Sequence, residues 1–176
     1  MADRFEGAAL PHLGAAYNLA RWLTGRDHDA EDVVQEAYVR AMKGFAGFRG
    51  DDVRAWLLTI VRNTGYTWLR KNRGELASLD HDGPDFPSAE PGPRELVMRD
   101  IDAQVLRETI ETLPPEFREV IVMRELEGLS YKQVAAVAGV PIGTVMSRLS
   151  RARQRLRELL CQQLSEEPQD GLPSNT

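Results

Sequence analysis

The sequence contains little of what a sheet-forming, disulfide-bonded or membrane-spanning protein requires. No segment alternates apolar and polar residues over the length of a strand, so we expect an all-helical fold. Cys161 is the single cysteine, which excludes an internal disulfide and makes the cytoplasm the simplest location. The longest apolar runs, such as 134–140, are far too short to span a bilayer, so no membrane insertion is expected.

Signs of an enzyme are also missing. His12, His28 and His81 are scattered along the chain, and neither a phosphate-binding loop nor a metal-ligand spacing is present. We therefore expect no catalytic residue, no metal and no cofactor.

The net charge of −5 is unevenly distributed along the 176 residues. Acidic side chains concentrate in segment 76–98, which is rich in proline and glycine and is typical of a flexible linker. They also concentrate in segment 165–176, where we expect a disordered tail. Two small helical domains, 1–75 and 99–164, make up the rest of the chain, and DNA binding by either depends on how charge is placed on its faces.

Helical spacing predicts about three helices in the first domain. The first covers 9–23, and the third covers 52–73. The second begins near Asp29, a good N-cap, with Asp32 in its first turn. The expected apolar stripe of this second helix comprises Val34, Ala37, Tyr38, Ala41, Met42 and Phe45.

The second domain is predicted to contain four helices, at 94–112, 116–126, 131–138 and 142–164. Ser130 caps the third of these, and Gly139-Val140-Pro141 forms a tight turn before the last. A short helix, a tight turn and a longer helix form the helix-turn-helix arrangement that binds duplex DNA.

The last helix carries the strongest functional signal. At about 100° per residue, one face is apolar and a second stripe is cationic. Arginine pairs with guanine, and hydroxyl groups suit phosphates. A solvated amphipathic face is the alternative, but five arginines stand against one acid, Glu158, which favours DNA. The apolar face comprises Val145, Leu149, Ala152 and Leu156, and the DNA-binding candidates are Thr144, Ser147, Arg148, Arg151 and Arg155.

Two further surfaces lie in the first domain. A tyrosine among basic and amide side chains on the 52–73 helix suits unpaired bases, although a plain basic face with a partly exposed tyrosine is the alternative. These side chains are Arg62, Asn63, Tyr66, Arg70 and Arg73. The 29–42 helix has an acidic outer side, either simply solvated or a docking face for a basic partner, formed by Glu31, Asp32, Gln35 and Glu36.

Two segments together resemble a known family. The segment DAEDVVQEAYVRAMKGFAGFRGDDVRAWLLTIVRNTGYTWLRKNR is similar to region 2 of extracytoplasmic-function sigma factors. The segment LPPEFREVIVMRELEGLSYKQVAAVAGVPIGTVMSRLSRARQRLREL is similar to their region 4. The resemblance covers about 10–75 and 100–160, in the family's order, and implies a region 2 bundle of three to four helices and a region 4 domain of four.

The resemblance also implies a role for each surface. Asp32, Gln35 and Glu36 would dock on the coiled coil of the largest subunit of core RNA polymerase. The loop at 45–52, with Phe48 and Arg49, would hold a flipped base of the minus-ten element, and Arg62, Asn63, Tyr66 and Arg70 would follow the melted strand. The last helix would read the minus-thirty-five element of promoter DNA. Phe117 and Ile121 would face the polymerase flap, and an anti-sigma factor would clamp the two domains.

Two positions depart from the family pattern, since Thr67 replaces a common aspartate and Met146 a common basic residue. Two other functions would use part of the same pattern. A stand-alone helix-turn-helix regulator would leave the Tyr66 face without a role. A sigma-like decoy for an anti-sigma factor would not need the recognition arginines.

Overall fold

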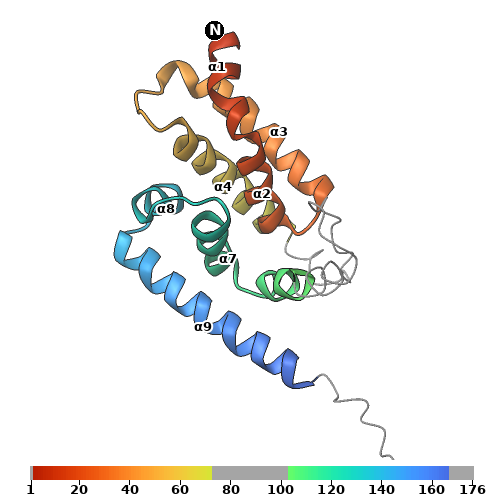
Figure 1. Cartoon of the computed structure of the whole chain (residues 1–176). Coiled ribbons are helices and arrows are strands. Elements are labelled where there is room, and N and C mark those ends of the chain that lie inside the picture. The colour runs from red at the N-terminus through yellow and green to blue at the C-terminus, as the bar shows by residue number, and fades with distance from the viewer. Residues whose placement is uncertain (1, 73–102, 167–176) are drawn as a thin grey trace, which may run out of the picture.

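The structure, a computed structural model, describes residues 2–72 and 103–166. Every regular element within these two ranges is a helix, which confirms the all-helical prediction (Figure 1). The predicted linker at 76–98 lies outside the described residues. Of the predicted tail at 165–176, residues 165 and 166 form the end of the last helix, and the rest lies outside the described residues.

The first half of the chain is a bundle of α2 (Leu13–Thr24), α3 (Asp27–Gly44) and α4 (Val53–Lys71), each packed on the other two. A further helix, α1 (Ala2–Ala9), and a 3-10 turn, η1 (Leu10–His12), precede it. The prediction of one helix over 9–23 was wrong. Pro11 has no amide hydrogen to donate and lies in the first turn of η1, so α1 ends before it and α2 begins after it.

The start of α3 also differs from the prediction. The helix begins at Asp27, so Asp29 lies in the first turn and is not the N-cap. Gly25, with a φ of 81°, reverses the chain after α2. The Asp27 carboxylate then accepts hydrogen bonds from Arg21 Nε at 2.6 Å and from the Tyr17 hydroxyl at 3.1 Å, which fixes the first turn of α3.

The exposed side of α3 carries one residue that was expected in the core. Met42 is 51% exposed, whereas Val34, Ala37 and Ala41 of the same predicted stripe are buried. Met42 lies at the edge of that stripe, about 80° from Val34 around the helix, where neither α2 nor α4 covers it.

The second half contains a helix at 103–111, then α7 (Pro115–Ile121), η3 (Val122–Leu126), α8 (Tyr131–Ala138) and α9 (Ile142–Glu166). The predicted 116–126 helix is present as α7 followed directly by η3, whose five residues form a π-helical turn. The Glu127 amide donates to the Val122 carbonyl oxygen at 3.0 Å, five residues back.

The two halves pack against each other. One cluster of buried apolar side chains extends from Leu19 and Leu58 in the first half to Val120 and Leu149 in the second. Contacts join α2 to α7 and α4 to α8, and Figure 1 shows α4 lying beside α7 and α8.

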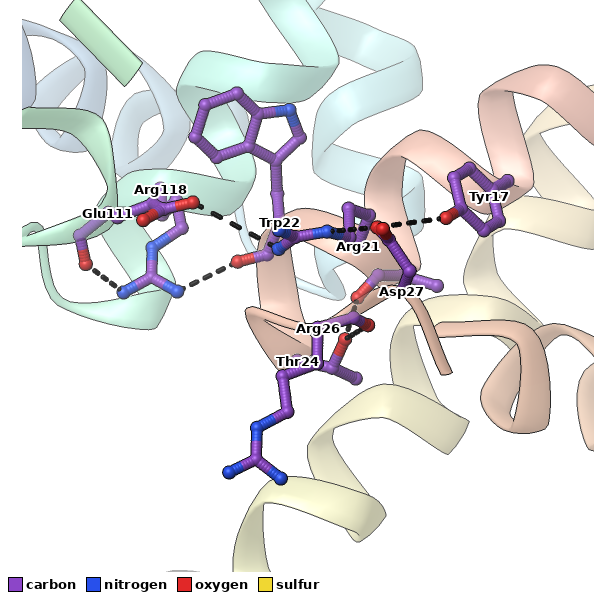
Figure 2. A network of polar contacts seen from close by, with 9 residues as sticks. Tyr17, Arg21, Trp22, Thr24, Arg26, Asp27, Glu111 and Arg118 are labelled. Atoms are coloured by element: carbon purple, nitrogen blue, oxygen red, sulfur yellow. Dashed lines mark hydrogen bonds and ion pairs between the residues drawn. The ribbon is translucent and has the colours of Figure 1, made fainter. Parts of the chain in front are cut away.

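A polar network at one end of this junction involves both halves (Figure 2). The guanidinium of Arg118 in α7 donates to the carbonyl oxygens of Trp22 at 2.7 Å and Leu113 at 2.9 Å. Arg21, itself buried, lies between Asp27 and Glu111, at 4.0 Å from the latter. The end of α2 is therefore attached to the second half through hydrogen bonds as well as apolar contacts.

Candidate nucleic-acid interface

The helix-turn-helix consists of α8 and α9, and local sequence fixes both of its joints. Ser130 and Gln133 form a reciprocal capping box, in which the Gln133 amide donates to Ser130 Oγ at 3.1 Å and the Ser130 amide to Gln133 Oε1 at 2.9 Å. Gly139 ends α8 in the left-handed region with a φ of 67°, which turns the chain into α9.

The apolar face of α9 has the predicted register. Val145, Leu149 and Ala152 are buried, so the opposite side of the helix faces outward. Ser147, Arg151 and Arg155 are exposed there, and Thr144 is partly exposed. This surface offers hydroxyl and guanidinium groups to a DNA groove.

Arg148 differs from the other candidates on α9. Its side chain is only 24% exposed, and its Nη1 lies 3.6 Å from Oε1 of Glu119 in α7. In this arrangement of the chain, Arg148 therefore faces the junction with α7 and not the outer side of α9.

The candidate residues of α4 line one hollow. Its volume is about 310 Å³, and its lining consists of Arg62, Asn63, Tyr66, Thr67 and Arg70. Asn63 and Arg70 are exposed, and Arg70 Nη2 donates to Thr67 Oγ1 at 3.2 Å. The structure thus brings Arg62, Asn63, Tyr66 and Arg70 together in one concave, cationic surface, and Arg73, the fifth residue predicted for it, lies outside the described residues.

Arg62 and Tyr66 are less accessible than the sequence indicated. Arg62 donates from Nε to Glu119 Oε2 at 2.8 Å and from Nη2 to Oε1 at 3.1 Å, and its guanidinium lies 4.2 Å from the Tyr66 ring centroid. Burial, followed by the Glu119 carboxylate, raises the pKa of Tyr66. The sequence pattern of α4 did not indicate these contacts, because Glu119 lies 57 residues along the chain from Arg62.

The loop between α3 and α4 is held by aromatic contacts. Phe48 is partly buried, with its ring centroid 4.8 Å from that of Trp56, and Phe45 lies beside both. Arg49 is exposed and donates to the Ala46 carbonyl oxygen at 2.7 Å. Phe48 and Arg49 therefore lie near the start of α4, apart from the hollow at Arg62–Arg70.

The predicted polymerase-binding residues share an exposed side of α3. Asp32, Gln35 and Glu36 are all exposed. Glu36 pairs with Arg40, and the Asp32 carboxylate lies 3.7 Å from His28 Nε2. The sequence did not indicate the exposed Met42 at the far end of the same helix, which adds an apolar part to this acidic surface.

One predicted surface is not formed as expected. Ile121, expected beside Phe117 on an apolar outer face of α7, is buried, and Phe117 is partly buried against the core. Within 2–72 and 103–166, no group of His, Cys, Asp and Glu is arranged to hold a metal ion. No helix in the described ranges has the length and apolar character needed to cross a membrane.

Comparison with known proteins identifies both halves. A family model of sigma-70 region 2 matches residues 9–75, and one of sigma-70 region 4 matches residues 103–156. The ECF RNA polymerase sigma-E factor of Escherichia coli is 37% identical over 137 residues, which cover 73% of this chain and 72% of that protein. The chain belongs to the ECF sigma factors of RNA polymerase.

Two other similarities support this membership of the sigma-factor family. The ECF sigma factor SigE of Mycolicibacterium smegmatis is 35% identical over 161 residues; the match spans 91% of this chain but only 63% of SigE. The sigma factor RpoE of Bartonella quintana, solved in complex with the anti-sigma factor NepR, matches with a TM-score of 0.72 and 33% identity. That match covers 90% of this chain and 97% of RpoE.

Proposed function

We propose that this sigma factor binds core RNA polymerase, directs it to specific promoters and helps to melt the minus-ten element, without catalysing a reaction itself. The observation that carries the proposal is the presence of two different nucleic-acid surfaces in one chain. The outward side of α9 suits duplex DNA, whereas the aromatic and cationic hollow of α4 suits unpaired bases.

The two surfaces divide the work. Region 4 would place the complex by binding the minus-thirty-five element as duplex, through Thr144, Ser147, Arg148, Arg151 and Arg155. Region 2 would then capture bases that have left the stack, so that its binding energy offsets the cost of unpairing them. In region 2, Phe48 and Arg49 would hold a flipped base and the α4 hollow the adjoining strand.

The polymerase contact belongs to the acidic side of α3. We assign Asp32, Gln35 and Glu36 to a basic surface on the coiled coil of the largest polymerase subunit, in a cytoplasmic complex. The flap contact is assigned to region 4 near Phe117 alone, because Ile121 is buried. The complex of the Bartonella quintana relative supports a further assignment, namely that an anti-sigma factor regulates this protein as well.

Transcription with purified core polymerase tests the proposal directly. Genomic DNA fragments are transcribed by core polymerase with and without the protein, and we expect discrete new transcripts that depend on it. A stand-alone regulator would bind DNA without polymerase and give no such transcripts. A decoy would neither bind DNA nor give transcripts.

A pair of variants tests the docking assignment. The Asp32→Lys/Glu36→Lys change should weaken co-purification with core polymerase by at least ten-fold, because two carboxylates facing a basic partner become cations. The matched control is Asp3→Lys, an exposed carboxylate of α1. Equal retention of both variants on core polymerase would remove the α3 assignment.

A further inference from the structure

The junction of region 2 and region 4 centres on a carboxylate to which no motif assigns a role. Glu119 of α7 is fully buried, and it accepts two hydrogen bonds from Arg62 of α4. The same carboxylate lies 3.6 Å from Arg148 of α9. One side chain of region 4 therefore holds an arginine from each of the two proposed DNA-binding surfaces.

A second carboxylate, close to the π-helical turn, strengthens the same junction. The Glu127 side chain is 10% exposed and accepts hydrogen bonds from Arg54 Nη2 at 3.0 Å and Asn18 Nδ2 at 2.9 Å. Arg54 also donates to the Glu127 carbonyl oxygen at 2.9 Å. The π turn ends at the residue before Glu127, so it sets where this carboxylate faces region 2.

These contacts engage part of the region 2 face that would take unpaired DNA, whereas Asn63 and Arg70 of that face remain exposed. Pairing with Glu119 takes up Nε and Nη2 of Arg62 and offsets its charge, and the Tyr66 hydroxyl oxygen is enclosed at the junction. The outward residues of α9, Ser147 and Arg151, remain exposed. The arrangement thus blocks the single-strand surface of region 2 more than the duplex surface of region 4.

We propose that this arrangement is an autoinhibited state, in which Glu119 and Glu127 of region 4 occupy the basic side chains of α4 until the two regions separate. The proposal rests on the proposed function, since it requires the α4 hollow to be the single-strand surface. When the two regions separate, water solvates the carboxylates, and the arginines contact water or DNA phosphate. The attraction within a partly buried ion pair is largely offset by the free energy needed to remove its charges from water. Such a contact can therefore form and still be reversible.

Arg54→Gln tests the proposal against simple electrostatics. The change removes a cation, so charge alone predicts weaker binding to DNA. Release of the Glu127 contact predicts the opposite, because apparent affinity rises with the fraction of open molecules. The matched control is Arg26→Gln, which removes the same charge from a cation paired with Asp29 inside region 2.

The probe is a fluorescein-labelled pool of random single-stranded DNA 20-mers, titrated with the full chain in the absence of polymerase. We expect Arg54→Gln to bind at least about three-fold more tightly than the parent and Arg26→Gln to bind no more tightly. Small-angle scattering of the same samples without DNA should show a larger radius of gyration for Arg54→Gln alone.

A charge-swapped pair separates loss of the contact from loss of folding. Glu127→Arg places two cations together and should also expand the protein, whereas Arg54→Glu/Glu127→Arg restores an ion pair at the parental net charge and should return both readouts toward the parent. Glu125→Arg, at a carboxylate paired with Arg153 inside region 4, controls for added charge. The proposal is overturned if Arg54→Gln weakens DNA binding, or if Glu127→Arg and Glu125→Arg behave alike. A failure of the proposed function is distinguished by the transcription assay, in which the parent protein would then give no new transcripts with core polymerase.

Discussion

In the proposed function, Tyr66 is the residue at which strand opening is most cleanly separated from duplex binding. Its ring lines the α4 hollow and lies against the Arg62 guanidinium. A stacking contact with an unpaired base contributes about 1–3 kcal/mol, so Tyr66→Ala should reduce the open complex by roughly 5- to 150-fold. Tyr66→Phe keeps the ring and should stay within about two-fold of the parent.

Stability must be controlled, because Tyr66 also packs against the core. Truncation of a fully buried aromatic side chain costs about 3–5 kcal/mol, and a partly buried ring such as Tyr66 should cost less. The matched control is Leu69→Ala, which trims a partly buried core contact on the same helix but outside the hollow. Thermal unfolding of each variant measures this loss.

The assay uses templates that the parent protein selects from genomic DNA with core polymerase. Permanganate reactivity of unpaired thymines reports opening, and gel retardation at low temperature reports the closed complex. We expect Tyr66→Ala to lose reactivity while retaining the closed complex, and Leu69→Ala to lose neither at a temperature where it is folded. Equal permanganate reactivity for Tyr66→Ala and the parent would refute the assignment of the hollow to melted DNA.

Three other changes should have defined outcomes. Arg151→Ala should weaken promoter binding by about 1–3 kcal/mol in titrations with duplex DNA, whereas Gln154→Ala, on the same exposed side, should not. Leu149→Ala should lower the free energy of unfolding by about 2–5 kcal/mol in urea titrations, because this side chain of α9 is buried in the core. Hydrogen bonds from the Ala55 amide and then from Gln133 lower the pKa of Asp52, so its stabilising effect is present above about pH 4 and is lost as acid protonates it. The difference in unfolding free energy between the parent and Asp52→Asn should therefore shrink below that pH, and a constant difference would contradict this.

Features set by neighbouring residues could be predicted from the sequence. The Ser130 cap needs only Gln133 three residues later, and the register of α9 follows from the spacing of its apolar residues. The start of α4 at Asp52 is equally local, since its side chain accepts from the Ala55 amide at 2.8 Å. The start of α3 was missed because Asp27 is held by Tyr17 and Arg21 of the preceding helix, which the pattern around Asp29 does not show.

Features set by the packing of the two halves could not be predicted in this way. Glu119 stands in an ordinary amphipathic helix, and its role depends on Arg62 and Arg148, which are distant in sequence and converge only after folding. Periodicity gives the face of a helix but not its neighbour, so it did not predict that Arg62 and Tyr66 contact Glu119. Met42 illustrates the reverse error, because an apolar residue at the edge of a stripe is buried only if another helix covers it.

The closed junction also lowers the number of cations that DNA can reach in a protein whose net charge is already −5. Binding to phosphates without sequence preference grows with the number of cations that can reach them, and it weakens with salt in proportion to that number. While the two regions remain together, Arg62, Arg148 and Arg54 are paired with Glu119 or Glu127 and are not available to phosphates. If opening frees them, the dependence of DNA affinity on salt should be steeper for the open Arg54→Gln protein than for the parent, although Arg54→Gln has one cation fewer. A shallower dependence would mean that the arginines at the junction never reach DNA.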